Sequence, residues 1–251
     1  MPPLTLHIEI AKGVAERLSN GLLDDERGNL YLGSTAPDIR VITSWERERT
    51  HFFDLGNFGE QSGVYSFLRA YPTLARRGSV SRPIAAFVAG YLSHLVMDEA
   101  WINSVYRPHF GSASPLGGGL KANVMDRALQ FSLDRDRRSD RDLIAHVVDA
   151  VARCDLGLEV GFIDSDTLQQ WHRVVLEMME QIPDWERFRH AARRHVGATE
   201  SSGEDFDALV SSLPDLVDET IRYLTPDLID SFMADALGRS VESVREYLEC
   251  A

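Results

Sequence analysis

Apolar residues near the start of the chain recur at helical spacing. Steps of four and three residues alternate between them, which places them on one face of a helix. These residues are Leu4, Ile8, Ala11, Ala15 and Leu18. The pattern predicts a first helix over residues 4–18 that ends near Asn20-Gly21, with His7 beside its apolar face.

The strongest helical segment follows Pro83. Ala, Leu, Val and Met dominate from Ile84 to about Val105, so we expect one long buried helix there. Residues 29–60 contain several Gly and Pro between short apolar pieces, which predicts loop and short helical turns. The glycine-rich stretch GSASPLGGGL, residues 111–120, predicts a flexible loop or lid.

The second half of the chain continues with helical patterns and almost no strand-like alternation. The expected helices span about 121–134, 140–154, 165–181, 184–197 and 204–224, with a linker at SSGED, residues 201–205, and two short helices to the end. The predicted class is all-α. We expect a single domain over residues 1–251, with candidate chemistry in about 1–134 and a helical half over about 135–251 that completes a cleft or forms a homodimer.

Composition narrows the possible partners. A formal charge of −13 argues against general binding to nucleic acid or anionic membranes, because both are polyanions. The apolar run AAFVAGYLSHLVM is shorter than the roughly 20 residues that span a bilayer, and the N-terminus lacks the pattern of a signal peptide. Cys154 and Cys250 show no metal or disulfide spacing. We therefore expect a cytoplasmic protein with reduced thiols and no integral membrane association.

The segment GYLSHLVMDEAWIN, residues 90–103, carries polar groups inside the apolar run. His94 and Asp98 are four residues apart and share one helical face, a spacing at which an imidazole and a carboxylate can hold one divalent cation. A metal offsets the cost of burying the carboxylate. Glu99 points about 100° away from Asp98, so we expect it at the surface or behind the ligands. Trp101 is best placed to flank such a site.

Three further residues upstream could join this pair. His7 lies in LTLHIEIA, Asp38 follows a proline in GSTAPDIR, and His51 lies beside two phenylalanines in RTHFFDL. Each alone is more often a packing, capping or turn residue than a ligand.

Together, the order His7, APD with Asp38, THF with His51 and GYLxHLxxD resembles the bacterial zinc-dependent phospholipase C family, whose wider relatives include single-strand-specific zinc nucleases. The match covers roughly residues 4–130. The resemblance implies an all-α fold with zinc at the bottom of a cleft. It implies that Asp38, His51, His94 and Asp98 hold one ion, and that Asp98 also bridges to a second ion held by His7.

The sequence also departs from that family. Six residues precede His7, so the processed N-terminal amino group that serves as a ligand in the secreted enzymes is missing in that form. The nearest candidates for the family's third site are His109 and Asp126, and Ala122 stands where a histidine would precede Asp126 by four residues. We therefore expect one or two ions, with Asp126 as an extra ligand or a general base.

The chemistry of these residue types is consistent with a hydrolase. A mixture of His and Asp ligands suits zinc and tolerates manganese or iron. The expected function is hydrolysis of a phosphodiester or phosphomonoester, with phospholipid as one candidate substrate, by a metal-bound hydroxide. Asp38 could instead hold the attacking water. The alternative is a non-catalytic helical binding or scaffold protein that keeps the fold and a structural metal.

Overall fold

The computed structural model describes residues 2–181, 184, 186 and 211–250, and these contain helices and no strand. The all-α prediction is confirmed for this part of the chain. In the first half the helices are α1 (Leu4–Leu18), α2 (Gly21–Asp25), α3 (Arg27–Thr35), η1 (Ala36–Ile39), α4 (Arg40–Thr43), α5 (Arg47–His51), α6 (Gly63–Ala70), α7 (Pro72–Ala75), η2 (Arg77–Ser79) and α8 (Arg82–Trp101). They continue with η3 (Ile102–Tyr106), α9 (Arg107–His109), α10 (Leu120–Arg138), α11 (Arg141–Ala152), α12 (Ser165–Glu180), α15 (Leu213–Leu224) and α16 (Pro226–Glu249).

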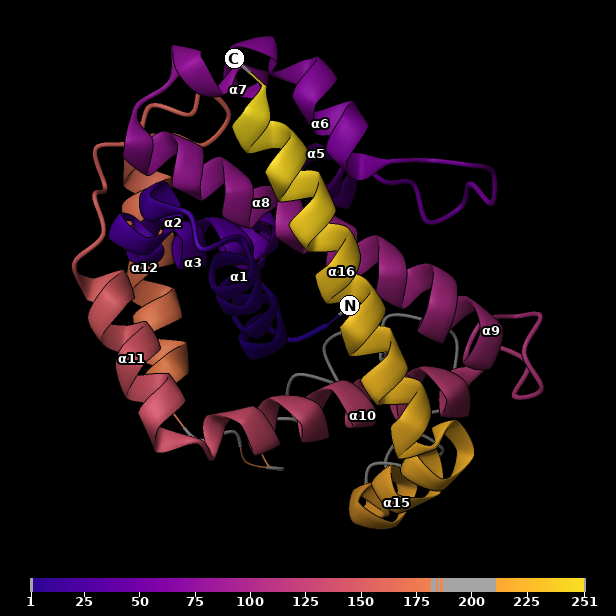
Figure 1. Cartoon of the computed structure of the whole chain (residues 1–251). Coiled ribbons are helices and arrows are strands. Elements are labelled where there is room, and N and C mark those ends of the chain that lie inside the picture. Colours follow the sequence, from indigo (N-terminus) through magenta and orange to yellow (C-terminus); the bar gives the residue numbers. More distant parts are fainter. Residues whose placement is uncertain (1, 182–183, 185, 187–210, 251) are drawn as a thin grey trace.

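Helix α8 is the centre of the fold. Every residue from Ala85 to Trp101 is buried, as expected for a helix that is apolar on almost all sides. The helices α1, α3, α6 and α16 pack around it; α16 crosses in front of α8 and also contacts α1 (Figure 1). The predicted helix over 84–105 is confirmed, with its last turn, η3, wound as a π-helix.

Helix α3 corrects the expectation of loop and short turns over residues 29–60. This helix is buried along most of its length and packs closely on α8. Gly33 lies inside this helix and does not end it. A Cβ on Gly33 would lie 2.0 Å from the carbonyl oxygen of Phe87, and a Cβ on Gly90 would lie 2.0 Å from the carbonyl oxygen of Leu30. Both glycines let the two helices approach closely. The short helices η1, α4 and α5 do match the predicted turns.

The C-terminal half agrees with the predictions in part. Helices α10, α11 and α12 lie close to the expected ranges, and α15 is the described part of the segment predicted over 204–224. The helix predicted over 184–197 and the linker at 201–205 lie mostly or wholly outside the described residues. The two short terminal helices are wrong, because the chain forms one helix, α16, that buries residues at four-residue spacing. These are Phe232, Ala236, Ser240 and Val244.

The predicted loop is also present, because residues 111–119 form turns in which Gly117 and Gly118 take positive φ angles. Among the helices that the structure describes, none is both long enough and apolar enough to cross a membrane.

The close contact between α3 and α8 predicts a sharp difference between two glycine substitutions. Gly33→Ala should lower the free energy of unfolding by about 3 kcal/mol, because the methyl group would collide with the Phe87 backbone. Gly238→Ala, inside α16 with nothing within 4 Å of its Cβ position, should raise it by about 0.5–1 kcal/mol. Urea unfolding measures both. Equal effects would contradict the packing described.

Candidate metal centre

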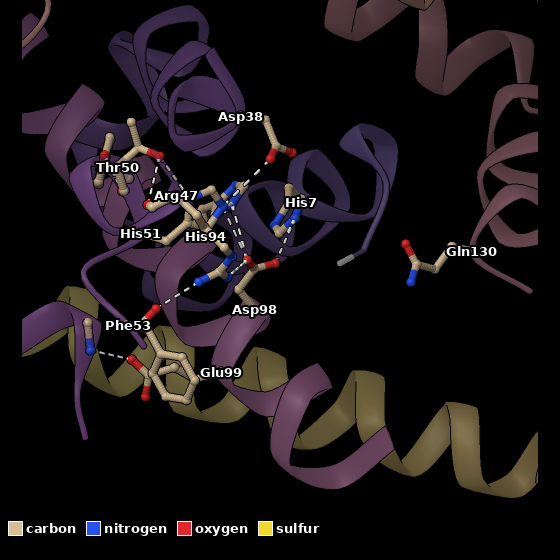
Figure 2. Close-up of polar contacts among 12 residues, drawn as sticks. His7, Asp38, Arg47, Thr50, His51, Phe53, His94, Asp98, Glu99 and Gln130 are labelled. Atoms are coloured by element: carbon tan, nitrogen blue, oxygen red, sulfur yellow. Dashed lines mark hydrogen bonds and ion pairs between the residues drawn. The ribbon is translucent and has the colours of Figure 1, made fainter. Parts of the chain in front are cut away.

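Five side chains from four elements converge beside the C-terminal half of α8. His7 comes from α1, Asp38 from η1, His51 from the end of α5, and His94 and Asp98 from α8 (Figure 2). The three histidines and Asp98 are buried, whereas the Asp38 side chain keeps 16% of its surface exposed. The structure thus brings together all five residues predicted to bind metal.

The three imidazoles lie against one another. The rings of His7 and His94 stack with their centroids 3.6 Å apart and 9° between their planes. His51 approaches His94 at a steep angle, so that the two Nε2 atoms are 3.4 Å apart. Histidines packed this closely repel one another when protonated, so they favour the neutral, metal-binding form.

The carboxylate oxygens lie between these rings. Asp98 Oδ1 is 3.6 Å from His7 Nε2, whereas Asp98 Oδ2 is 3.3 Å from His51 Nε2 and 3.9 Å from His94 Nε2. Asp38 Oδ1 is 3.6 Å from His51 Nε2. Most of these separations are longer than hydrogen bonds. They match the roughly 3.4 Å between two ligands that each lie about 2.1 Å from one tetrahedral ion.

Two overlapping groups of donors result. His7, His94 and Asp98 form one, and Asp38, His51 and His94 form the other; within each group the donor atoms lie within 4.8 Å of one another. Three buried atoms of the first group, His7 Nδ1, His7 Nε2 and Asp98 Oδ1, have no hydrogen-bond partner among the described residues. Buried polar atoms are normally satisfied. The residues therefore fit a bound cation, which would take up His7 Nε2 and Asp98 Oδ1, two of these three atoms.

Neighbouring groups orient the imidazoles. His94 Nδ1 lies 2.8 Å from the carbonyl oxygen of Ser34, and because a carbonyl only accepts, Nδ1 carries the proton and Nε2 keeps its lone pair toward the cluster. His51 Nδ1 lies 2.9 Å from Thr50 Oγ1, which leaves His51 Nε2 facing the carboxylates. Both histidines present Nε2 as a ligand.

Arg47 is a residue of the site that the sequence did not predict. Its Nη2 donates to Asp98 Oδ2 at 2.8 Å and its Nη1 donates to the Phe53 carbonyl oxygen at 2.9 Å. The side chain is buried, with 7% of the residue exposed. One signal could have found it: Arg47 precedes His51 by four residues and so shares its face on α5.

The electrostatics of the cluster favour neutral His7 and His94 and ionised carboxylates. Burial, followed by the proximity of His7, lowers the pKa of His94 to about 3, and burial also lowers the pKa of His7. Burial by itself raises the pKa of Asp38 and Asp98, but the neighbouring histidines outweigh it and lower both below the usual range. This is the protonation state in which such residues bind a cation.

Asp126 and His109 stand apart from the cluster. Asp126 belongs to neither group of donors, because it accepts hydrogen bonds from Trp101 Nε1 at 3.1 Å and from Gln130 Nε2 at 2.8 Å. His109 also belongs to neither group and packs edge-on against Tyr223. The expectation that Asp126 is an extra ligand is not supported by this geometry.

Glu99 corrects part of another expectation. It does point away from the five residues, but it is buried and not at the surface. Its carboxylate accepts a hydrogen bond from the backbone N–H of Gly63, at the start of α6 (Figure 2). Glu99 therefore fixes α6 on α8.

A cavity of about 890 Å³ begins one helical turn beyond Asp98. Trp101, at the end of α8, lines it together with Ile102 and Tyr106 of the π-helical turn η3 and with Asp126. The loop around Phe58 and the turns at 111–118 form its other walls. Trp101 lies three residues after Asp98 and lines this cavity, and π-helical turns are frequent at functional sites.

Two further histidines of the described residues, His146 and His172, have hydrogen-bond partners outside the cluster. His146 Nε2 lies 3.1 Å from the Tyr31 hydroxyl, and His172 Nε2 lies 2.9 Å from the Val151 carbonyl oxygen. Cys154 and Cys250 are free thiols. His190 and His195 lie outside the described residues.

Comparisons of the chain with protein-family models, with characterised proteins and with solved structures find no significant match. The chemistry of the cluster itself is therefore the basis for a function.

The lowered histidine pKa values predict a pH dependence of stability in metal-free protein. An unfolded histidine takes up its proton near pH 6.5, whereas folded His94 does so near pH 3, so between these values the unfolded chain binds more protons. The free energy of unfolding should be constant above about pH 7. Below about pH 6.5 it should fall by up to about 1.4 kcal/mol per pH unit for each such histidine.

Urea unfolding at pH 7 and pH 5 with a chelator present measures this dependence. In the variant His94→Gln the free energy of unfolding should fall less between pH 7 and pH 5. His146→Gln, which removes an exposed histidine, should behave like the wild type. A slope unaffected by His94→Gln would show that this ring is not held neutral by burial.

Proposed function

We propose that this protein is a metal-dependent hydrolase of a phosphoester. The observation that carries the proposal is the buried cluster of three histidines and two aspartates, three of whose polar atoms have no partner in the described part of the chain. Buried polar atoms are normally hydrogen-bonded, whereas here His7 Nε2 and Asp98 Oδ1 lie 3.6 Å apart and neither has a hydrogen-bond partner among the described residues.

The donor set is consistent with zinc, and it would also accept manganese or iron. His7, His94 and Asp98 would hold an ion, with Asp38 and His51 directly beside it. A bound dication supplies the charge that lowers the pKa of water to near 7 and stabilises the oxygens of a phosphoryl group.

Side chains and backbone groups of the protein would position the water molecule and the metal ligands. Asp38 is the one carboxylate of the cluster with appreciable exposure, 16%, so it is best placed to orient a water molecule and accept its proton. Ser34 and Thr50 hold the rings of His94 and His51 in position. Such fixed geometry avoids reorganisation when charge develops on the substrate.

The neighbouring cavity supports a substrate with an organic group attached to the phosphate. Its walls are largely apolar or aromatic, from Phe58, Trp101 and Tyr106, with Asn123 and Arg127 as polar groups. Binding cavities of this kind combine apolar walls with a few polar contacts. A phosphodiester or phosphomonoester with an apolar or aromatic group fits this description.

A non-catalytic protein that keeps a structural metal is the second candidate. The Arg47 guanidinium already holds Asp98 Oδ2, and Asp126 is engaged with Trp101 and Gln130, so two carboxylates expected to take part in the chemistry have other partners. Both candidate functions require the metal centre, and only the hydrolase would turn over a substrate.

The test is metal content and activity in matched variants. Wild-type protein should bind zinc or manganese near stoichiometry, measured by elemental analysis after dialysis, and should hydrolyse a chromogenic phosphodiester or phosphomonoester. His94→Ala should weaken metal binding by at least roughly 100-fold, because mutating only the residues that hydrogen-bond to metal ligands already lowers metal affinity roughly 10–100-fold. His146→Ala, at an exposed position, is the control and should retain both properties.

Absence of bound metal in folded wild-type protein, with His94→Ala indistinguishable from it, would overturn the proposal. Stoichiometric metal without turnover of any substrate across several metals would favour the structural role.

A further inference from the structure

We infer that Arg47 restricts the centre to one dication, held by His7, His94 and Asp98 Oδ1. The inference rests on the metal centre of the proposed function and adds a stoichiometry and a position to it. It follows from three features: the two directions of the Asp98 carboxylate, the single free lone pair of His94 and the place of the Arg47 guanidinium.

The Asp98 carboxylate faces two different sets of ligands. Oδ1 points to His7, at 3.6 Å from its Nε2, whereas Oδ2 points to His51, at 3.3 Å from its Nε2. Figure 2 shows the carboxylate between these rings. A carboxylate in this position could bridge two ions, one through each oxygen.

Both groups of donors depend on the same histidine. His94 is common to the group with His7 and Asp98 and to the group with Asp38 and His51. Its Nδ1 donates to the Ser34 carbonyl oxygen, so Nε2 offers one lone pair and can bind one ion. Once His94 belongs to the first ion, a second ion beside Asp38 and His51 needs Asp98 Oδ2 as its third ligand.

Arg47 occupies one lone pair of that oxygen and places a fixed positive charge beside it. Its Nη2 donates to Asp98 Oδ2 at 2.8 Å, while the bond from Nη1 to the Phe53 carbonyl fixes the plane of the guanidinium. The guanidinium stays protonated at all relevant pH values. Asp98 Oδ1, in contrast, has no hydrogen-bond partner among the described residues and remains open to an ion on the side of His7.

The net charge of the cluster also disfavours a second dication. Three neutral histidines with Asp38 and Asp98 carry a formal charge of −2, and Arg47 reduces it to −1, a sum over the cluster residues alone. One dication then leaves a net charge of +1, whereas a second would be placed beside a buried guanidinium and another dication. Repulsion is strong where water is excluded, so the second ion should bind at least roughly tenfold more weakly than it would without Arg47.

The experiment is a zinc titration of folded protein, with binding measured by calorimetry and metal content by elemental analysis after dialysis. Wild type should bind about one ion per chain and Arg47→Gln about two, because Asp98 Oδ2 becomes available to bridge. Arg47→Lys keeps the charge and should remain near one. Arg49→Gln is the matched control, because Arg49 lies on the same short helix but is exposed and stacks over Trp45.

Two further variants test the position of the ion with Arg47 intact, which keeps the test decisive if Arg47→Gln does not fold. His7→Gln should abolish stoichiometric binding, whereas Asp38→Asn should leave about one ion bound. Two ions in wild type, one ion in folded Arg47→Gln, or loss of the ion in folded Asp38→Asn would each overturn the inference. No ion in any protein, wild type included, would instead overturn the metal centre itself.

Discussion

The carboxylate of Asp98 lies on α8, a helix buried from Ala85 to Trp101, and the local structure is organised around compensating its charge. An ionised carboxylate removed from water is costly unless it is paired and hydrogen-bonded. Here Arg47 binds one oxygen directly, while the other faces His7 without a hydrogen-bond partner among the described residues. Because only one of the two Asp98 oxygens is hydrogen-bonded, the carboxylate favours a cation beside the other oxygen.

The fold holds the other groups around this carboxylate. Helix α8 is fixed by α3, which approaches closely through Gly33 and Gly90, and by α16, which covers α8 together with α1. The Ser34 carbonyl at the end of α3 then orients His94. Rigid helices therefore determine where the ligands point, as a preorganised metal site requires. The apolar cavity begins where α8 ends, at Trp101.

The sequence predicted the parts of this arrangement that local patterns encode. The apolar run after Pro83 indicated α8, and four-residue spacing placed His94 and Asp98 on one face. That His7, Asp38 and His51 join them is a long-range property; it was expected only because their order resembles a known family, and periodicity alone contains no such information.

Other features depended on packing that local patterns do not reveal. Gly33 reads as a loop signal but serves a close contact between helices, and Gly238 lies inside one long helix where two short ones were expected. Arg47 reads as one of several charges in a polar segment, and only the folded chain places it on Asp98. Asp126 matched the expected order of residues, yet its partners are Trp101 and Gln130.

Anomalous diffraction from zinc-loaded crystals would show whether the five residues form a metal centre. An anomalous peak is expected within about 2.0–2.2 Å of His7 Nε2, His94 Nε2 and an oxygen of Asp98. Crystals of folded, zinc-soaked protein with no peak inside the cluster, and with His7 Nε2 still unliganded, would contradict the proposed metal centre.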